Sequence, residues 1–277
     1  MENITIMLNG VPVSAPPGTT ILELAKEVGI DIPTLCHDEH LKPYGACRIC
    51  IVEDESTGRL LASCVTPIAK GMNIKTHSPR VIESRKNIIK LMLASHPESC
   101  IVCDKGNRCQ LRKVAAELGI GLSDLDPIPQ PAEIVDANPF IVRDLSKCIL
   151  CAKCIRADHE LVVQGAIDYV NRGFDAYPAT LGMTSLEKSV CTFCGTCLTV
   201  CPTGALAEKR KTLRGTAADW TPSVCPYCGC GCSILLGTKG GIITEISPNL
   251  KDPLDRLTLC ARGHFGTDFV HSHERIR

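Results

Sequence analysis

The pattern of apolar and polar residues predicts a β-hairpin and then a short helix at the start of the chain. Ile4, Ile6 and Leu8 stand at alternate positions, Asn9-Gly10 is a strong turn signal, and Val11 and Val13 resume the strand. Apolar residues then recur at helical spacing over residues 21–28, with Thr19-Thr20 before them to cap the helix. We therefore expect two antiparallel strands and one helix before the first cysteine.

Two more helices and a linker are predicted further along the chain. Ser78-Pro79 is a good helix start, and apolar residues repeat at helical spacing from there to His96-Pro97, where the helix should end. Another helix is expected over residues 111–118. Residues 121–137 are rich in proline, aspartate and glycine and predict a linker, and residues 234–236 predict a strand.

Cysteine is the residue type that narrows the function class, because 19 of the 277 residues are cysteines. The start, Met1-Glu2-Asn3-Ile4-Thr5, has no basic segment followed by an apolar stretch, so it does not resemble a signal peptide. An odd number of cysteines without such a signal favours metal binding in a reducing cytoplasm over disulfides. No apolar run reaches the ~18–20 residues of a membrane span. We expect a cytoplasmic protein that binds no membrane.

Charge and aromatic content narrow the picture further. Thirty acidic and thirty basic residues give a formal charge of zero, which implies no basic face and gives nucleic-acid binding no support. The chain has one tryptophan, four tyrosines and five phenylalanines. Each domain therefore has few large core residues, and bound clusters are expected to stabilise the fold by cross-linking the chain from within.

The first cysteine group follows the predicted hairpin and helix, an order typical of a β-grasp ferredoxin. Its spacing, C-x10-C-x2-C-x13-C, has a wider first gap than plant-type ferredoxins. It resembles the N-terminal [2Fe-2S] domain of the large iron–sulfur subunit of respiratory complex I, of iron-only hydrogenases and of NAD-linked formate dehydrogenases. The resemblance implies a [2Fe-2S] domain over residues 1–77, although four cysteines could also bind zinc. The implied ligands are Cys36, Cys47, Cys50 and Cys64.

A histidine and three cysteines form the second group, in residues 78–120. The spacing His96-x3-Cys100-x2-Cys103-x5-Cys109 is similar to the [4Fe-4S] motif of the same three families. A histidine beside a proline is commonly a surface or capping residue, but three cysteines need a fourth ligand and the spacing supplies one. A nitrogen ligand removes a negative charge and should raise the reduction potential of this cluster, as imidazole does in Rieske centres.

Residues 138–210 are similar to a bacterial two-cluster ferredoxin, in which the last cysteine of each run serves the other cluster. The second run ends in Cys201-Pro202, and the first run has Asp158 where a cysteine is expected. The resemblance implies one cluster on Cys148, Cys151, Cys154 and Cys201, and another on Cys191, Cys194 and Cys197.

Asp158 is the main departure from the ferredoxin pattern and leaves several outcomes open. The carboxylate could bind the fourth iron, a water or hydroxide could do so, or the site could lose that iron and hold [3Fe-4S]. Asp158 could also be an unrelated surface residue. We predict four irons with Asp158 as a ligand or near-ligand. A carboxylate is a harder donor than a thiolate, so the potential and the stability of this cluster should both change.

The last group lies in residues 218–277 and has the spacing C-x2-C-x3-C-x27-C. It looks like the [4Fe-4S] domain that opens molybdenum or tungsten bis-pterin enzymes, particularly formate dehydrogenases. Those enzymes need several hundred further residues, and a lysine commonly stands where this chain has Arg262, so we expect no pterin in this chain. Cys230 is left over; we expect a small buried residue there, with ligation as the alternative. The implied ligands are Cys225, Cys228, Cys232 and Cys260.

Together the resemblances imply an α+β protein with four iron–sulfur domains. These are a β-grasp [2Fe-2S] domain, a helical [4Fe-4S] domain with one histidine and three cysteine ligands, a two-cluster ferredoxin-like domain and a small [4Fe-4S] domain of the bis-pterin oxidoreductase type. The sequence has no glycine-rich dinucleotide motif and no nucleophile–base pair, so no catalytic residue is predicted. The expected function is electron transfer through one [2Fe-2S] and four [4Fe-4S] clusters.

The same resemblance implies partners that carry out the chemistry. A flavin- and NAD(H)-binding subunit is expected at the N-terminal end, and a second redox subunit or a ferredoxin at the other. We prefer a flavin-based, electron-bifurcating NAD(P)H/ferredoxin oxidoreductase of the transhydrogenase type. The alternatives are an NAD(P)-dependent molybdenum or tungsten formate dehydrogenase, as its electron-transfer subunit or its N-terminal piece, and an NAD(P)-linked hydrogenase. A zinc-binding interaction module is a further class, and it would be colourless.

Overall fold

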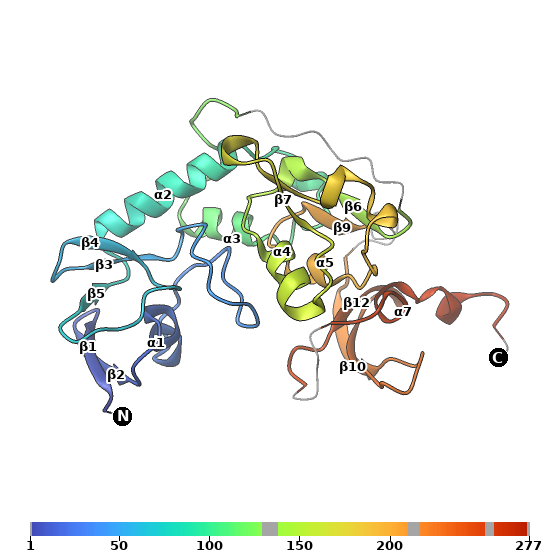
Figure 1. Cartoon of the computed structure of the whole chain (residues 1–277), viewed down its shortest axis with the longest axis horizontal. Helices are drawn as coiled ribbons and strands as arrows, with labels where there is room; N and C mark the ends of the chain where they lie inside the picture. The colour runs from blue at the N-terminus through green and yellow to red at the C-terminus, as the bar shows by residue number, and fades with distance from the viewer. Residues whose placement is uncertain (1, 129–137, 210–215, 253–257, 276–277) are drawn as a thin grey trace. The chain divides into compact units, whose positions relative to one another are not determined.

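The computed structural model describes residues 2–128, 138–209, 216–252 and 258–275, in which helices and strands are mixed (Figure 1). The chain divides into two compact units, each with its own buried cores. The first unit comprises residues 1–98, 108–130 and 149–151, and the second comprises residues 99–107, 131–148 and 152–277.

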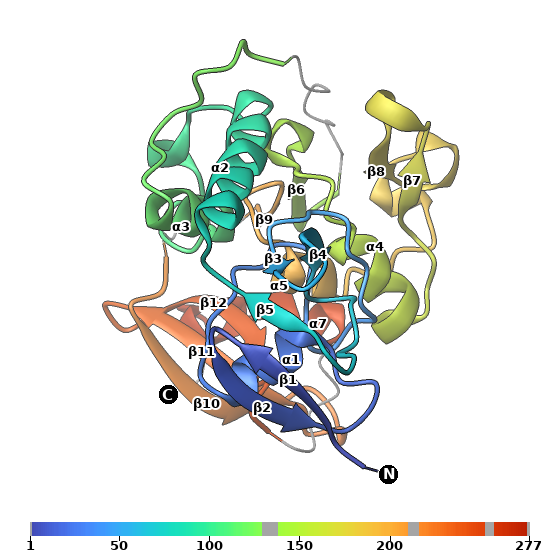
Figure 2. The same ribbon diagram turned by 90° about the vertical axis from the view of Figure 1, so that its left-hand side faces the viewer.

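A five-stranded sheet opens the first unit (Figure 2). Its strands are β1 (Ile4–Leu8), β2 (Val11–Ala15), β3 (Ile51–Asp54), β4 (Arg59–Ala62) and β5 (Asn73–Lys75). They lie in the order β2-β1-β5-β3-β4. β1 and β2 form the antiparallel hairpin that the sequence predicts, with Ile6 opposite Val13. β1 pairs in parallel with β5, and β3 runs antiparallel to both β4 and β5.

Helix α1 (Ile21–Glu27) covers this sheet and confirms the predicted first helix. It begins at a capping box in which the Thr20 hydroxyl accepts a hydrogen bond from the Glu23 N–H and the Thr20 N–H donates to the Glu23 carboxylate (2.7 Å). Its buried apolar side chains share one core with the sheet, and that core includes Cys50 and Cys64, each only 1% exposed. Two predicted cluster ligands are therefore part of the core itself.

Asp54, the last residue of β3, is a buried carboxylate that ties the turn after β3 to β5. It accepts hydrogen bonds from the hydroxyls of Ser56 (2.7 Å) and Thr57 (2.8 Å) and from the N–H of Asn73 (3.1 Å). Burial by itself raises the pKa of this carboxyl, but the hydrogen bonds together outweigh burial, and the pKa lies below its ordinary value. The fold therefore stabilises the charged form.

We expect Asp54→Asn to destabilise the protein by about 1–3 kcal/mol at neutral pH, because three donors lose a buried, charged acceptor. The folded pKa is lower than the unfolded value of about 3.9. The contribution of the charge is therefore complete above that value and is lost as the pH falls through the folded pKa. Urea unfolding of parent and variant, side by side from neutral to acidic pH, measures this. Asp31→Asn, at an exposed position of the same unit, is the control; equal effects of the two substitutions would contradict the prediction.

Two helices complete the first unit. They are α2 (Pro79–Ala94) and α3 (Gln110–Glu117). α2 begins at Ser78, whose hydroxyl accepts a hydrogen bond from the Val81 N–H (3.2 Å), so the predicted start is confirmed. Ile89 of α2 and Leu111 of α3 are buried in one core with Leu35 of the first cysteine loop. This core holds the cysteine loop against the two helices.

Short strands and helical turns form most of the second unit. They are η1 (Cys100–Val102), β6 (Ile141–Arg143), η2 (Leu145–Lys147), α4 (Lys153–Ala157), the π-helical turn η3 (Asp158–Val162), β7 (Asp168–Val170), η4 (Gly173–Asp175), β8 (Tyr177–Ala179), η5 (Leu181–Met183), η6 (Leu186–Lys188), α5 (Thr196–Val200) and β9 (Leu206–Glu208). β6 pairs with β9 and β7 with β8, both antiparallel. Ile141, Ile155, Leu198 and Phe265 share the core of this part.

Three antiparallel strands follow in the second unit: β10 (Asp219–Val224), β11 (Ser233–Lys239) and β12 (Ile242–Pro248). β11 contains the strand predicted at residues 234–236. Helix α7 (Ala261–Phe265) contacts β12, and the short turn η7 (Asp268–His271) comes after it. Ile234, Ile246 and Leu259 are buried together with Cys225 in the core of this segment.

The predicted linker over residues 121–137 lies only partly within the described residues. Residues 121–128 carry no helix or strand, and residues 129–137 lie outside the described part. Among the residues that the structure does describe, no helix is both long and apolar enough to cross a membrane.

Candidate iron–sulfur sites

Four buried thiols of the first unit converge beside β3. Cys47 and Cys50 lie in the loop that leads into β3, and Cys64 follows β4, the strand paired with it. The Sγ atoms of Cys50 and Cys64 are 3.3 Å apart. The N–H of Cys36 donates to Cys47 Sγ (3.4 Å), and the Cys36 sulfur also bonds the Cys64 thiol. The structure thus brings together the four cysteines that the sequence assigns to the first cluster.

Hydrogen bonds between these thiols separate them into proton acceptors and proton donors. The bonds with Cys47 and Cys64 lower the pKa of Cys36 to about 2. The bond with Cys64 lowers the pKa of Cys50 to about 6. The bonds to Cys36, together with burial, raise the pKa values of Cys47 and Cys64. Because metals bind cysteine as thiolate, metal binding at this site would release the shared protons. Four buried sulfurs are a donor set that suits iron.

The backbone beside His96 favours one tautomer of its ring. It lies just after α2, where its N–H donates to the Leu93 carbonyl oxygen (3.0 Å). Its Nδ1 is 3.1 Å from the Pro97 carbonyl oxygen, which can only accept, so Nδ1 carries the proton and Nε2 the lone pair. Metal-binding histidines commonly donate their other N–H to a backbone carbonyl.

The other predicted ligands of the second cluster occupy well-defined local positions. Cys109 directly precedes α3 in the first unit, whereas Cys100 begins η1 and Cys103 directly follows it in the second unit. Because these three cysteines are divided between the two units, the site that combines them with His96 stays a prediction.

The two central cysteine runs share an unusual backbone. In each run the residues before and after the middle cysteine have left-handed φ angles: Leu150 (54°) and Ala152 (58°) in the first, Phe193 (53°) and Gly195 (77°) in the second. This conformation costs a non-glycine residue about 1–2 kcal/mol. The side chains differ, so what the runs share is a turn of the backbone around the cysteines. Successive N–H groups in such turns form anion-binding concavities, which fits an anionic cluster.

Each central run leads into a short helix, and its remaining cysteines lie around that helix. Cys154 lies in α4, and Cys201 directly follows α5. Lys105 donates to the carbonyl oxygens of Leu198 (3.1 Å) and Cys201 (2.9 Å), which fixes the end of α5. Cys151 falls in the first unit and the other three cysteines of its predicted cluster in the second. That ligand set therefore also stays a prediction.

Asp158 is buried, being only 8% exposed, so the reading of it as a surface residue is wrong. Its Oδ2 accepts hydrogen bonds from the N–H groups of Ala166 (2.5 Å) and Ile167 (3.1 Å). Burial raises the pKa of the Cys197 thiol, and the charges of Cys194, Cys191, Cys201 and Asp158 raise it further. The aspartate therefore lies within electrostatic reach of the second cysteine run. Its hydrogen bonds also fix the loop that follows η3.

We expect Asp158→Cys to change the EPR signal of one cluster only, because a thiolate would replace a carboxylate or a solvent ligand at one iron. Asp158→Asn is the matched control, since its amide oxygen can still accept from Ala166 and Ile167 while the negative charge is lost. If the spectrum of Asp158→Cys equals the parent spectrum, Asp158 does not coordinate iron. Its role would then be to fix the loop after η3.

The C-terminal cysteines gather on one loop and one helix start. Cys225, Cys228 and Cys232 lie on the loop between β10 and β11, and Cys260 caps α7. The Cys225 N–H donates to the Cys232 carbonyl oxygen (2.9 Å). Burial raises the pKa of the Cys232 thiol, and so do the charges of Cys225, Cys228 and Cys260. The four predicted ligands are therefore neighbours.

The expectation that Cys230 is buried is wrong, because this residue is exposed on the loop between β10 and β11. Hydrogen bonds from its backbone and side chain lower the pKa of the neighbouring Cys228 thiol, to which the charge of Arg262 also contributes. Cys230 thus supports the thiolate form of a predicted ligand.

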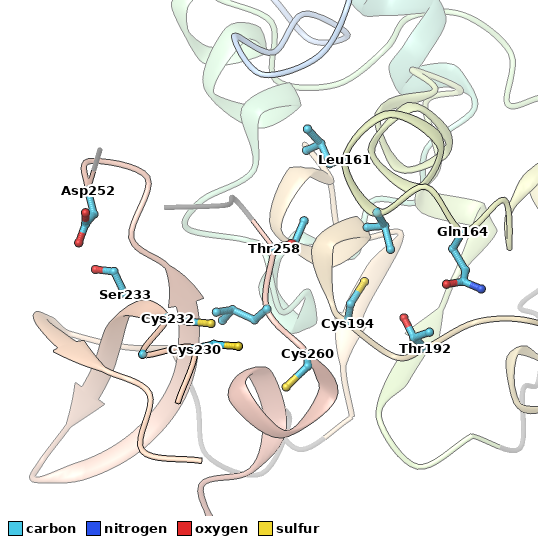
Figure 3. Close-up of a pocket in the computed structure, with 13 residues that line it drawn as sticks. Leu161, Gln164, Thr192, Cys194, Cys230, Cys232, Ser233, Asp252, Thr258 and Cys260 are labelled. Carbon is cyan, nitrogen blue, oxygen red and sulfur yellow. The ribbon is translucent and has the colours of Figure 1, made fainter. Parts of the chain in front are cut away.

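A cavity of about 490 Å³ in the second unit adjoins these cysteines. Figure 3 shows Cys230, Cys232 and Cys260 gathered on one side of it, with Cys194, Thr192 and Gln164 on the other. The sequence assigned Cys194 and Cys260 to separate clusters and gave no sign that they line one space. Their separation along the chain carries no such signal, because only the folding of the second unit brings them together.

The chain matches four family models, all of iron–sulfur domains. They are a 2Fe-2S iron-sulfur cluster binding domain (residues 1–79), the NADH-ubiquinone oxidoreductase-G iron-sulfur binding region (85–123), the ferredoxin-like domain of NADH-quinone oxidoreductase subunit 3 (138–207) and the molybdopterin oxidoreductase Fe4S4 domain (218–272). These matches define an iron–sulfur protein with one 2Fe-2S domain and further 4Fe-4S domains.

Known proteins and a solved structure are similar over most of the chain. Subunit alpha of an NADPH-Fe(3+) oxidoreductase from Geobacter sulfurreducens is 36% identical over 99% of this chain and 32% of its own length. NADP-reducing hydrogenase subunit HndD from Solidesulfovibrio fructosivorans is 40% identical over 75% of this chain and 36% of its own. A crystal structure of an NAD+-reducing [NiFe]-hydrogenase in the H2-reduced state has a chain with a TM-score of 0.68 and 30% identity; the match covers 74% of this chain and 87% of that one.

The chain belongs to the iron–sulfur protein family that includes NADH-quinone oxidoreductase subunit 3 and NADP-reducing hydrogenase subunit HndD. It spans about a third of the length of the curated relatives it matches, 32% in the first of them. The sequence-based resemblance to this family is thereby confirmed.

Proposed function

We propose that this chain is the electron-transfer subunit of an NAD(P)H-linked oxidoreductase and carries electrons through one [2Fe-2S] and four [4Fe-4S] clusters. The observation that carries the proposal is the convergence of four buried thiols beside β3. The matching left-handed turns in the two central cysteine runs support it as well. Iron–sulfur clusters are held by thiolates in such runs. Zinc is the weaker candidate, because all four family models that the chain matches are of iron–sulfur domains.

The proposal assigns the clusters to four domains. A β-grasp [2Fe-2S] domain covers residues 1–77, a histidine-plus-three-cysteine domain 78–120, a two-cluster domain 138–210 and a bis-pterin-type domain 218–277. The chain's own groups bury the four cysteines of the first site, present backbone N–H groups to the central runs and, at His96, offer a nitrogen in place of a sulfur. The clusters, when bound, supply the electron-accepting iron. Conversion of substrate is assigned to partner subunits in the cytoplasm.

The partners that we propose are a flavin- and NAD(H)-binding subunit and a second redox subunit or ferredoxin. The names of the relatives support a nicotinamide-linked complex, since they include NADPH, NADP and NADH activities. Within that class we prefer a flavin-based, electron-bifurcating NAD(P)H/ferredoxin oxidoreductase. Arg262 supports this choice, because it stands where pterin enzymes commonly carry a lysine, and its charge acts on the Cys228 thiol.

A second candidate is an electron-transfer role in a hydrogenase or a formate dehydrogenase. It is favoured by the match to subunit HndD, by the similar chain of the [NiFe]-hydrogenase structure and by the molybdopterin-type Fe4S4 domain. The two candidates differ in the metal of the partner subunit. Nickel, molybdenum or tungsten in the purified complex would favour the second, and a second flavin without these metals the first.

The experiment is anaerobic purification of the native complex with analysis of iron, acid-labile sulfide, zinc and flavin. We expect about 18 irons per chain if every cluster is full, and a brown colour that NAD(P)H bleaches only when the flavin subunit is present. About ten irons would refute the five-cluster count. Zinc in place of iron, without colour, would refute electron transfer altogether.

A further inference from the structure

Arg85 is a cation buried in the core of the first unit. It lies on α2, which packs against β3, and it is only 2% exposed. One terminal nitrogen of its guanidinium donates to the Ile51 carbonyl oxygen (2.7 Å). Its Nε has no hydrogen-bond partner among the described residues. A carbonyl oxygen supplies a dipole and no charge, so this bond leaves the cation without a counter-ion.

The carboxylates of β3 do not supply that counter-ion. Glu53 accepts from the hydroxyl of Ser78 (2.5 Å) and from Arg80 (3.2 Å). The Asp54 carboxylate is bonded to the turn after β3 and to β5. Neither forms an ion pair with Arg85 within the described part of the chain.

The guanidinium of Arg85 reaches the backbone next to Cys50, because Ile51, whose carbonyl oxygen it bonds, directly follows Cys50 in the chain. Burial lowers the pKa of the guanidinium to about 10, and the Cys50 thiolate opposes this shift. Arg85 therefore remains a cation at neutral pH. Cys50 belongs to the converging set of four cysteines, and iron binding makes every member of such a set a thiolate. With two iron(III) ions, two sulfides and four thiolates, an oxidised cluster carries a net charge of about −2, and reduction adds one more negative charge near Arg85.

We propose that Arg85 is the buried counter-ion of the [2Fe-2S] site and raises the reduction potential of the cluster there. A buried charge is stable only when an opposite charge compensates it, and the thiolate-bound cluster is the anion that this geometry offers. The inference rests on the proposed [2Fe-2S] cluster. Arg85 does not itself bind iron. It acts on the cluster through the positive charge of its guanidinium group.

The effect on potential follows from the charge that reduction adds. One electron, from a partner flavin or from dithionite in a titration, converts one iron(III) to iron(II) with no bond broken. Arg85 stabilises the added negative charge, because Coulomb attraction is strong at short distance in a low-dielectric interior. A neutral side chain at this position should therefore make the cluster harder to reduce.

The test is an anaerobic redox titration of the complete, cluster-loaded protein, followed by the EPR signal of the [2Fe-2S] cluster. The variants are Arg85→Gln and Arg85→Met, which are neutral, and Arg85→Lys, which keeps the charge. Lys86→Gln removes an exposed charge from the next position of α2 and controls for overall charge. We expect the neutral variants to lower the reduced-to-oxidised ratio at a fixed potential at least tenfold, a shift of about 59 mV. Arg85→Lys and Lys86→Gln should change it much less.

Each outcome separates the inference from the function on which it rests. A neutral variant with the parent potential, or an Arg85→Lys shift as large as that of Arg85→Gln, would overturn the counter-ion role. The neutral variants could fail to hold the cluster. In that case, an EPR signal retained by Arg85→Lys would support the need for a positive charge. Loss of the signal from Arg85→Lys as well would overturn the counter-ion role. Absence of iron and of the EPR signal from the parent protein itself would instead refute the proposed function.

Discussion

Cys232→Ala is expected to remove about four irons per chain, because its thiol lies among the charges of Cys225, Cys228 and Cys260. With one of four thiolates missing, the C-terminal site can no longer enclose a cluster. The apolar core around this loop is small and includes Cys225. Loss of the cluster should therefore also lower the thermal unfolding midpoint, since bound metal contributes folding free energy. Iron and sulfide analysis after anaerobic purification measures the first effect, and a thermal scan the second.

The matched control is Cys230→Ala, two positions away on the same loop and lining the same cavity. It is expected to keep the full iron content, because Cys230 stands outside the predicted ligand set and acts only through its hydrogen bonds to Cys228. Loss of four irons from Cys230→Ala, with a full count in Cys232→Ala, would exchange the two residues in the ligand assignment.

Gly195→Ala should be among the most damaging single substitutions in the second unit. Gly195 has a φ of 77°, and a Cβ there would lie 2.6 Å from the ring of His264. The left-handed backbone costs alanine about 1–2 kcal/mol, and the overpacking adds about 1–3 kcal/mol. His264 cannot easily yield, because it is 6% exposed and its ring lies against Phe265, which stacks on Phe140 with centroids 4.7 Å apart.

The thermal unfolding midpoint of the cluster-loaded protein measures this loss. Gly165→Ala separates strain from crowding, because Gly165 has a similar φ of 67° but nothing within 4 Å of an added Cβ. Gly165→Ala should therefore lower the unfolding midpoint only by the cost of the left-handed backbone conformation. A second change, His264→Ala, should recover part of the Gly195→Ala loss by opening space for the methyl group. Equal effects of the two glycine substitutions would mean that Gly195 and His264 are not packed as described.

The contact between Gly195 and His264 also bears on the proposed path of electrons. Gly195 stands between two predicted ligands of one cluster, and His264 follows Cys260, a predicted ligand of another. The same two segments line the cavity that contains Cys194 and Cys260. Packing at this point therefore brings two predicted cluster sites together within the second compact unit.

Local features of this protein could be predicted from the sequence because they depend on few neighbouring residues. The hairpin at residues 4–15, the helix that begins at Ser78 and the strand at residues 234–236 follow from alternation, capping and turn residues. The grouping of Cys36, Cys47, Cys50 and Cys64 follows instead from the resemblance of their spacing to the [2Fe-2S] domain of known families.

The amino-acid sequence alone was enough to predict which residue types bind iron and the order of the iron–sulfur domains along the chain. The surroundings of those residues became known only from the folded chain: Asp158 is buried and Cys230 exposed, Arg85 bonds the carbonyl oxygen of Ile51 next to Cys50, and Cys194 and Cys260 line one cavity. The reason is physical. Ligand spacing is a property of short segments, whereas burial, charge pairing and shared cavities depend on segments that only the packing of a whole unit brings together.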